Sequence, residues 1–282
     1  YLRMKDAMKA DGGSTIVMPL IYDFNNTANS YSKMEVLDTT EQEGISAAEY
    51  NWRQVSVQVS INGLDRTLNN GKQRVINLLE GKMKQAELSI ENKVSTMLFG
   101  DGTGNSGKDL LGLEAIIKQD PTSGTLGGIN SATSSFWRNY TNTSVGSFAA
   151  NGLGAMSTAM RSLTRGGDRP NLIVTGSTIF GYLETVANGR AQFMNPKLAE
   201  LGFQALKFEG ADVIFDSACP SDRIYFINTD YLKLAYHPDK FFSVGKFIEP
   251  ADQDGTVAKI LFYGQLVTDR RESLGVLSGI TA

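Results

Sequence analysis

The sequence is poor in the residues that form disulfides, bind metals or act in catalysis. Its 282 residues include one cysteine, Cys219, and one histidine, His237. A single cysteine forms no intrachain disulfide, so the fold does not depend on an oxidising compartment. A structural zinc site draws about four ligands, mostly from cysteine and histidine, and is excluded. A Ser-His-Asp hydrolase would have to use His237, and no Gly-x-Ser-x-Gly turn occurs. No catalytic residue, metal or cofactor is expected.

Long apolar runs and an excess of basic charge are also missing. No apolar stretch approaches the roughly 20 residues that cross a bilayer, so no membrane partner is expected. The first residues, YLRMKDAMKADGG, lack the apolar centre of a signal peptide. With 27 Lys and Arg against 30 Asp and Glu, the net charge is -3, which gives no general attraction to nucleic acid. A dedicated DNA-binding protein is therefore disfavoured.

One stretch resembles a nucleotide-binding motif. DGTGNSGKDL (101–110) has Gly102, Gly107 and Lys108 at the spacing of a phosphate-binding loop. However, Asp109 stands where a serine or threonine would hold magnesium, and the preceding SIENKVSTMLFG has the pattern of a helix end rather than a strand. We interpret 101–110 as a glycine-rich turn that leaves a helix. A nucleotide hydrolase is the alternative from the enzyme class.

The N-terminal third combines extended segments with a polar stretch between them. TIVMPLIYD (14–22) predicts a strand, and Pro19 favours an edge position because proline cannot donate to a ladder. YNWRQVSVQVSIN (50–62) alternates apolar and polar residues, which is typical of a half-buried strand. We expect these two strands to pair. A two-stranded ribbon is marginal in water, so residues 14–62 should lean on another surface.

A long helix and a layered unit follow. Apolar residues spaced by three and four predict a helix over roughly 72–98, much longer than the usual three turns. From about 145 to 240, amphipathic helices alternate with short strands, including NLIVT, ADVIFD, RIYFIN and LKLAY, which predicts an α/β-layered unit. Asp254-Gly255 then predicts a hairpin turn before a long strand, TVAKILFYGQLVTD.

Two aromatic and basic pairs are candidate contacts between subunits. Trp52-Arg53 and Trp137-Arg138 combine residue types that are favoured at protein interfaces. The alternative is that the indoles fill cores and the arginines face solvent. The candidate subunit-interface residues are Trp52, Arg53, Val55, Val57, Val59, Trp137 and Arg138.

The combination of segments resembles the major capsid (coat) proteins of tailed bacteriophages over nearly the whole chain. The segments that carry the resemblance are EYNWRQVSVQVSIN, NNGKQRVINLLEGKMKQAE, LFGDGTGN, LLGLEAII, GGIN, FWRN and YFINTDYLKL. It implies an α+β capsid fold, shared with herpesviruses and encapsulins. Its expected parts are an N-terminal arm (1–13), an extended β-loop (14–62), a peripheral domain with a long backbone helix (63–140, with returning strands at 245–282) and an axial domain (141–244).

The resemblance implies that the chain is no enzyme. It is expected to assemble with copies of itself into the pentamers and hexamers of an icosahedral virion shell around the phage genome, with the extended loop lying across a neighbouring subunit. Portal, scaffold, maturation protease and cement proteins are further partners that it allows, and packaged double-stranded DNA is expected to be contacted weakly. Some family members cross-link a lysine to an asparagine, and no motif assigns that chemistry to Lys33 here. The nearest alternative is an encapsulin-like shell that encloses enzymes.

Overall fold

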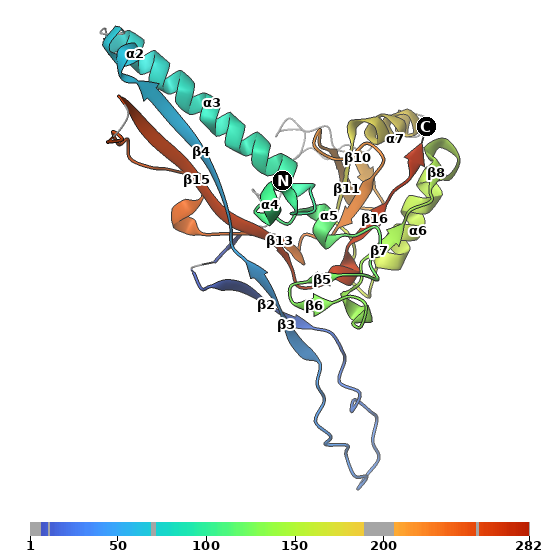
Figure 1. The fold of residues 1–282 in the computed structure, drawn as a ribbon. Coiled ribbons are helices and arrows are strands. Elements are labelled where there is room, and N and C mark those ends of the chain that lie inside the picture. The colour runs from blue at the N-terminus through green and yellow to red at the C-terminus, as the bar shows by residue number, and fades with distance from the viewer. Residues whose placement is uncertain (1–6, 11, 69–71, 189–205, 252–253, 282) are drawn as a thin grey trace.

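The structure is a computed structural model that describes residues 7–10, 12–68, 72–188, 206–251 and 254–281 (Figure 1). The expected mixture of helices and strands is confirmed. Two sheets form the body of the molecule, one beneath a long helix and one covered by two shorter helices, and a thin ribbon projects from it. Of the predicted N-terminal arm, the first six residues and residue 11 lie outside the described residues.

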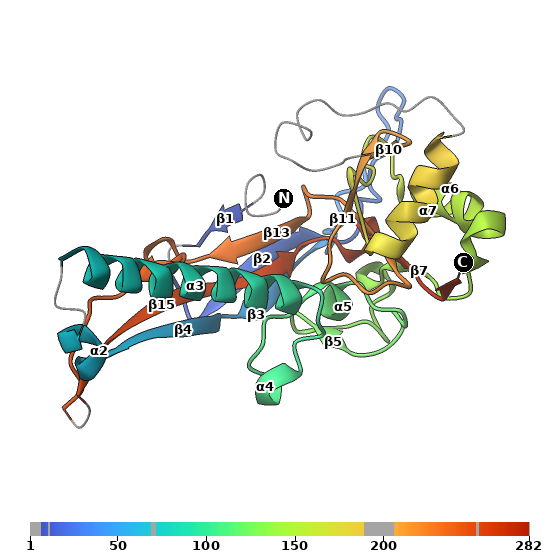
Figure 2. The same cartoon turned by 90° about the horizontal axis from the view of Figure 1, so that it is seen from above.

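The predicted long helix is confirmed as α3 (Lys72–Leu98). It lies along a sheet formed by β1 (Ala7–Lys9), β13 (Leu232–Tyr236), β15 (Gly255–Thr268) and β14 (Ser243–Val244), with β4 (Arg53–Asn62) also paired to β15 (Figures 1 and 2). The inward side chains of β4 are Val55 and Val59, which meet Ala86, Ile90 and Val94 of the helix in one buried cluster. The apolar residues that recur about every 3.6 positions in the helix therefore pack against those that recur every second position in the strand.

The pairing expected between 14–22 and 50–62 is wrong. β2 (Thr15–Ile21) pairs instead with β3 (Ile45–Asn51), from Thr15 opposite Asn51 to Ile21 opposite Ile45. β4 pairs with β15 along its whole length, from Arg53 opposite Gly264 to Asn62 opposite Gly255. An alternating strand has one face to bury, and a partner about 200 residues away in the sequence supplies the sheet that buries it.

The second sheet has six strands in the order β10 (Leu206–Phe208), β11 (Ala211–Phe215), β9 (Leu172–Thr175), β12 (Ile224–Ile227), β16 (Gly275–Leu277), β7 (Tyr140–Asn142). α6 (Leu153–Leu163) and α7 (Ser177–Asn188) bury Met156, Ile179 and Phe180 in a cluster with strand residues such as Ile173 and Ile224. The layered unit is therefore present, with three differences in membership. β13 joins the sheet beneath α3, whereas β7, which precedes the predicted unit, and β16, from the C-terminal tail, enter this second sheet.

The predicted hairpin near Asp254-Gly255 is confirmed, because Ile248 bridges Val257 and β14 pairs with β15. Short elements connect the larger parts. They are α2 (Gly63–Leu68), α4 (Gly104–Gly107), α5 (Leu113–Ile116), β5 (Thr125–Leu126), β6 (Ile129–Asn130), β8 (Gly146–Ser147) and β17 (Ile280–Thr281), with single 3-10 or π turns at Ser135–Trp137, Phe148–Gly152, Pro238–Lys240 and Arg271–Ser273.

Candidate assembly surface

The β2–β3 ribbon has one face on the body of the molecule and one face in solvent. Ile16, Met18 and Leu20 of β2 are buried and belong to the largest core cluster. Their neighbours Val17 and Ile21 are 53% and 76% exposed. Since successive residues of a strand point to opposite faces, the inward set anchors the ribbon. The outward set is left for another surface.

Buried polar contacts fix the base of the ribbon. The Tyr50 hydroxyl donates to the Thr268 carbonyl oxygen at 2.8 Å, and burial raises the pKa of this phenol, so it stays a donor. The Glu49 amide donates to the Gly127 carbonyl oxygen at 3.0 Å. Gly127 has a φ of +60°, and a Cβ there would lie 2.8 Å from the Cβ of Ala48, so only glycine suits this approach. The Tyr22 ring stacks on Phe136 with centroids 4.7 Å apart.

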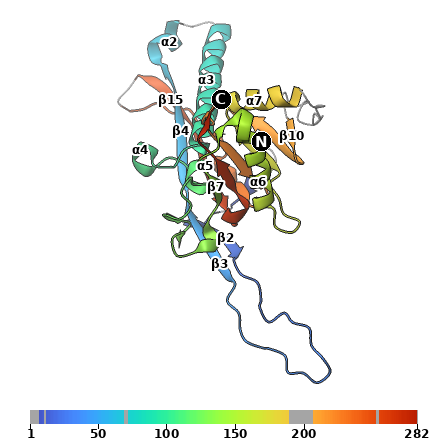
Figure 3. The same ribbon diagram turned by 90° about the vertical axis from the view of Figure 1, so that its right-hand side faces the viewer.

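Beyond this base, residues 22–44 form a long loop that extends away from the body (Figures 1 and 3). Its side-chain hydrogen bonds are local: the Thr27 amide donates to Asn25 Oδ1, the Ser32 amide to Glu35 Oε2, and the Thr40 amide to Asp38 Oδ1. The two bonds from Thr40 lower the pKa of the Asp38 carboxyl, so it stays charged. These hydrogen bonds stabilise short turns, and both partners of each bond lie within the loop.

Large apolar side chains are nevertheless exposed along this projection. Met34 and Val36 are 102% and 94% exposed, which means that they have essentially no neighbours. Covering a side chain of this size contributes about 1.5–3 kcal/mol. The exposed apolar residues of ribbon and loop, here called the ribbon-loop set, are Val17, Ile21, Phe24, Tyr31, Met34, Val36, Leu37 and Ile45.

The projection is also the most acidic part of the chain. Residues 14–51 contain six carboxylates, of Asp23, Glu35, Asp38, Glu41, Glu43 and Glu49, against the single cation of Lys33. This segment is therefore more negative than the whole chain, whose net charge is -3, and the remainder carries a slight net positive charge.

Several residues predicted at a subunit interface are already covered within the chain. Val55 and Val59 are buried beneath α3, and Val57 is half-buried against the same cluster. Trp137 is 1% exposed, and its indole donates to the Leu126 carbonyl oxygen at 3.0 Å. Packing inside one subunit accounts for these four residues.

The other predicted interface residues lie nearer the surface. Trp52 is half-buried where β3 passes into β4, and its indole donates to the Gly13 carbonyl oxygen at 3.0 Å. Arg53 is half-buried on β4. Arg138 donates to the carbonyl oxygens of Ser131 and Ala132 at 2.7 and 2.8 Å. A contact with a neighbouring copy stays a prediction for these three residues.

The interpretation of 101–110 as the exit from a helix is confirmed. The stretch follows α3 directly, and its short turn α4 has left-handed backbone at Asn105 and Ser106. A phosphate-binding loop would join a strand to a longer helix. Cys219 is buried, as expected for a small apolar residue, and burial raises the pKa of its thiol to about 12. His237 Nδ1 accepts from the Asp239 amide, which is the role of a turn residue.

The described residues show neither a metal-binding cluster nor a membrane-spanning helix. They contain no group of three or more His, Cys, Asp or Glu side chains that could hold a metal ion. None of their helices is long and apolar enough to span a membrane.

Solved structures with this fold are protein shells. The asymmetric unit of the cyanophage A-1(L) capsid matches with a TM-score of 0.73 at 17% identity, covering 100% of this chain and 92% of that one. The capsid of a native GTA particle gives 0.65 at 13% identity, covering 99% and 90%. The SrpI encapsulin of Synechococcus elongatus gives 0.62 at 10% identity, covering 99% and 86%. The chain therefore has the fold of these phage capsid and encapsulin proteins.

The family follows from the sequence itself. The family model for the SU10 major capsid protein matches residues 14–281, nearly the whole chain. A search of curated proteins found no similar sequence. The chain belongs to the SU10 major capsid protein family, and its place is the capsid shell of a virion. The family and its fold are structural rather than enzymatic.

Proposed function

We propose that each copy of this major capsid protein closes the shell by laying its ribbon and loop across an adjacent copy, in rings of five and six subunits. The observation that carries this proposal is the ribbon-loop set, because its eight apolar side chains are between 53% and 102% exposed. Identical copies bury such surfaces on one another in closed symmetric assemblies. The hydrogen bond from the Tyr50 hydroxyl to the Thr268 carbonyl oxygen would fix the orientation of the ribbon, so that the projection extends toward the neighbouring copy.

Charge supports the same arrangement. The acidic projection would meet a chain whose remainder carries a slight net positive charge. Contacts between exposed charges are screened by salt, with a Debye length of about 10 Å at 0.1 M ionic strength. Assembly should therefore be slower at high ionic strength, while apolar burial holds the finished shell together.

Within the shell, we propose that the six-stranded sheet and its helices form an axial part and the α3 sheet a peripheral part. Packaged double-stranded DNA would be contacted weakly, because a net charge of -3 gives the chain no excess of positive charge to attract phosphates. Portal, scaffold, maturation protease and cement proteins are further proposed partners. One structural neighbour, a satellite phage P4 procapsid, includes a size determination protein, which illustrates such an accessory partner in that system.

Assembly of the purified chain tests the proposal. We expect negative-stain microscopy and light scattering to detect rings, tubes or closed shells whose yield rises with protein concentration. Addition of 1 M salt, where the Debye length is about 3 Å, should slow the rise in scattering. A chain that stays monomeric at every concentration, and that hydrolyses ATP in a manner lost in Lys108→Ala, would contradict the proposal and favour the nucleotide hydrolase instead.

A further inference from the structure

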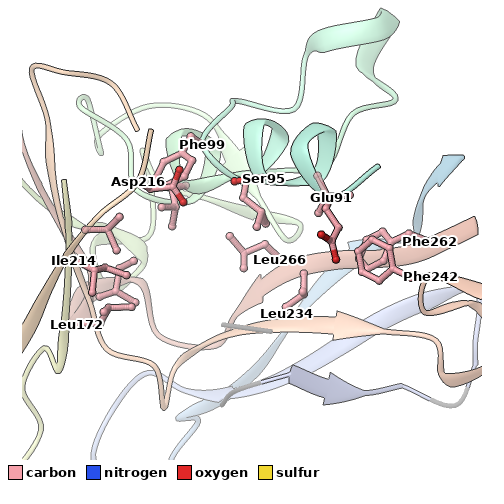
Figure 4. A pocket seen from close by; sticks show the side chains of 15 residues that line it. Glu91, Ser95, Phe99, Leu172, Ile214, Asp216, Leu234, Phe242, Phe262 and Leu266 are labelled. Atoms are coloured by element: carbon pink, nitrogen blue, oxygen red, sulfur yellow. The ribbon is translucent and has the colours of Figure 1, made fainter. Parts of the chain in front are cut away.

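The sheet beneath α3 has one face that the helix covers. Val55 of β4 and Phe262 of β15 belong to the buried cluster that includes residues of α3. Figure 4 shows Phe262 and Leu266 of the sheet lining a cavity of about 320 Å³ together with Ser95 of the helix. Successive residues of a strand point to opposite faces, so the residues between these inward side chains lie on the face turned away from α3.

The face turned away from α3 is accessible along β4 and the first part of β15. On β4, the alternate residues from Gln54 to Ser60 are all exposed. Their cross-strand partners on β15 share this face and are Val257, Lys259, Leu261 and Tyr263. Lys259 is exposed, and the other three partners are half-buried. These residues of the two strands, here called the open face, therefore combine polar side chains with a partly accessible apolar strip.

The strands of this sheet contain cations and no carboxylate. β1, β4, β13, β14 and β15 include Lys9, Arg53, Lys233 and Lys259 but no aspartate or glutamate. The whole chain has more acidic than basic residues, 30 against 27, so the composition of this sheet is unlike the average. Lys259 is the cation on the open face. A partner with negative charge suits this face, because complementary charges select partners and orient them.

The projecting loop contains a segment with the complementary chemistry. Residues 34–38 read MEVLD, so the carboxylates of Glu35 and Asp38 alternate with exposed apolar side chains of Met34, Val36 and Leu37. In Figures 1 and 3 the loop extends away from the body of its own chain. A second copy is therefore the chain whose open face this segment would meet.

We propose that residues 34–38 of one copy dock on the open face of the adjacent copy, with Glu35 and Asp38 beside Lys259 and the apolar side chains over Leu261 and Tyr263. This inference rests on the proposed contact between copies and adds the surface that receives the loop. Lys259 is then the residue that determines where the loop docks, because any other position leaves this cation and the two carboxylates without partners.

Charge reversal on both sides of the contact tests this proposal. Lys259→Glu should lower the yield of shells, counted by negative-stain microscopy, by about tenfold or more, because a third carboxylate then faces Glu35 and Asp38. The pair Glu35→Lys and Asp38→Lys should lower the yield similarly, because three cations then meet. All three changes in one chain place opposite charges together again and should restore most of the yield.

A matched control and a second measurement assign the effect to the open face. Lys93 is exposed on α3, which covers the other face of the sheet, so Lys93→Glu should leave the yield unchanged. Unfolding midpoints of all these variants should agree with that of the unchanged chain, because every substituted side chain is exposed. In the unchanged chain, acetylation of Lys259 by acetic anhydride, followed by mass spectrometry, should be about tenfold slower or more in shells than in free subunits.

Three results would overturn the proposal: equal shell yields for Lys259→Glu and Lys93→Glu, no recovery when all three charges are reversed, or equal acetylation of Lys259 in shells and in free subunits. In each of these cases the unchanged chain still forms shells, so the proposed function stands and only the docking surface is wrong. An unchanged chain that forms no shells would contradict the proposed function and this inference with it.

Discussion

Replacing Arg271 with methionine is expected to destabilise the folded subunit strongly. Arg271 is 0% exposed, yet its guanidinium donates to four neutral acceptors: the carbonyl oxygens of Ile116 and Trp137, Ser131 Oγ and Asn139 Oδ1, at 2.7 to 3.1 Å. Burial lowers its pKa to about 10, so it remains charged at neutral pH. Methionine fills similar space but removes all four donated bonds, although Asn139 Oδ1 still accepts from the Lys118 amide and the Trp137 carbonyl oxygen from the Ser131 hydroxyl.

The expected cost of Arg271→Met is about 1–3 kcal/mol for each buried acceptor that loses its donor. That is a large part of the roughly 5–15 kcal/mol that stabilises a typical domain. Arg271→Lys should cost nearly as much, because one ammonium cannot replace a planar fork of five donors. Denaturant midpoints, or loss of soluble protein on expression, measure the effect.

The adjacent arginine provides the control. Arg270 is 26% exposed at its side chain and forms ion pairs with Asp168 and Glu272 at 2.9 Å. Pairs of this exposure contribute about 0–1 kcal/mol, so Arg270→Met should stay soluble with a small shift in midpoint. If Arg271→Met unfolds at the same denaturant concentration as Arg270→Met, the buried network does not have the structural role assigned to it.

Shortening the loop is expected to separate folding from assembly. Replacing residues 24–43 with a short glycine-serine turn keeps the closing hydrogen bond from the Tyr22 amide to the Gly44 carbonyl oxygen and the buried face of β2. The unfolding midpoint should therefore change little, while shell formation falls below detection by microscopy. A subunit that folds and still forms normal shells would contradict the proposed contact between copies.

A finer variant tests which part of the loop matters. Phe24→Ser, Met34→Ser and Val36→Ser together remove three of the most exposed apolar side chains without changing loop length. If a neighbour covers each of them, the loss is about 1.5–3 kcal/mol per residue at every contact. Tyr31→Phe, which keeps the apolar ring at an exposed position, should assemble normally.

Elements with strong local periodicity could be predicted from the sequence. The helix expected over roughly 72–98 has the bounds Lys72–Leu98, because its apolar residues recur every three to four positions and a turn signal precedes them. The alternation in 53–62 likewise identified which side chains of β4 face inward, with Val55 and Val59 buried. In both cases neighbouring residues carry the information.

Pairing partners and burial could not be predicted in the same way. Which strand lies beside β4 depends on β15, nearly 200 residues away, and the alternating pattern fits any partner. Arg270 and Arg271 are adjacent and identical, yet one faces acids at the surface and the other the interior. Only the packing of distant segments distinguishes them. The apolar residues of 24–45 were overlooked because they are scattered among Asn, Ser, Thr and Glu.

Oxidation of Met34 by dilute hydrogen peroxide, followed by mass spectrometry, tests the central claim most directly. Met34 in the loop is 102% exposed and Met18 in the ribbon 5%, so unassembled subunits should oxidise rapidly at the first and slowly at the second. We expect the Met34 rate to fall at least tenfold in assembled shells, with Met18 unchanged. If Met34 in the shell reacts as fast as in the free subunit, the loop does not lie on a neighbouring copy.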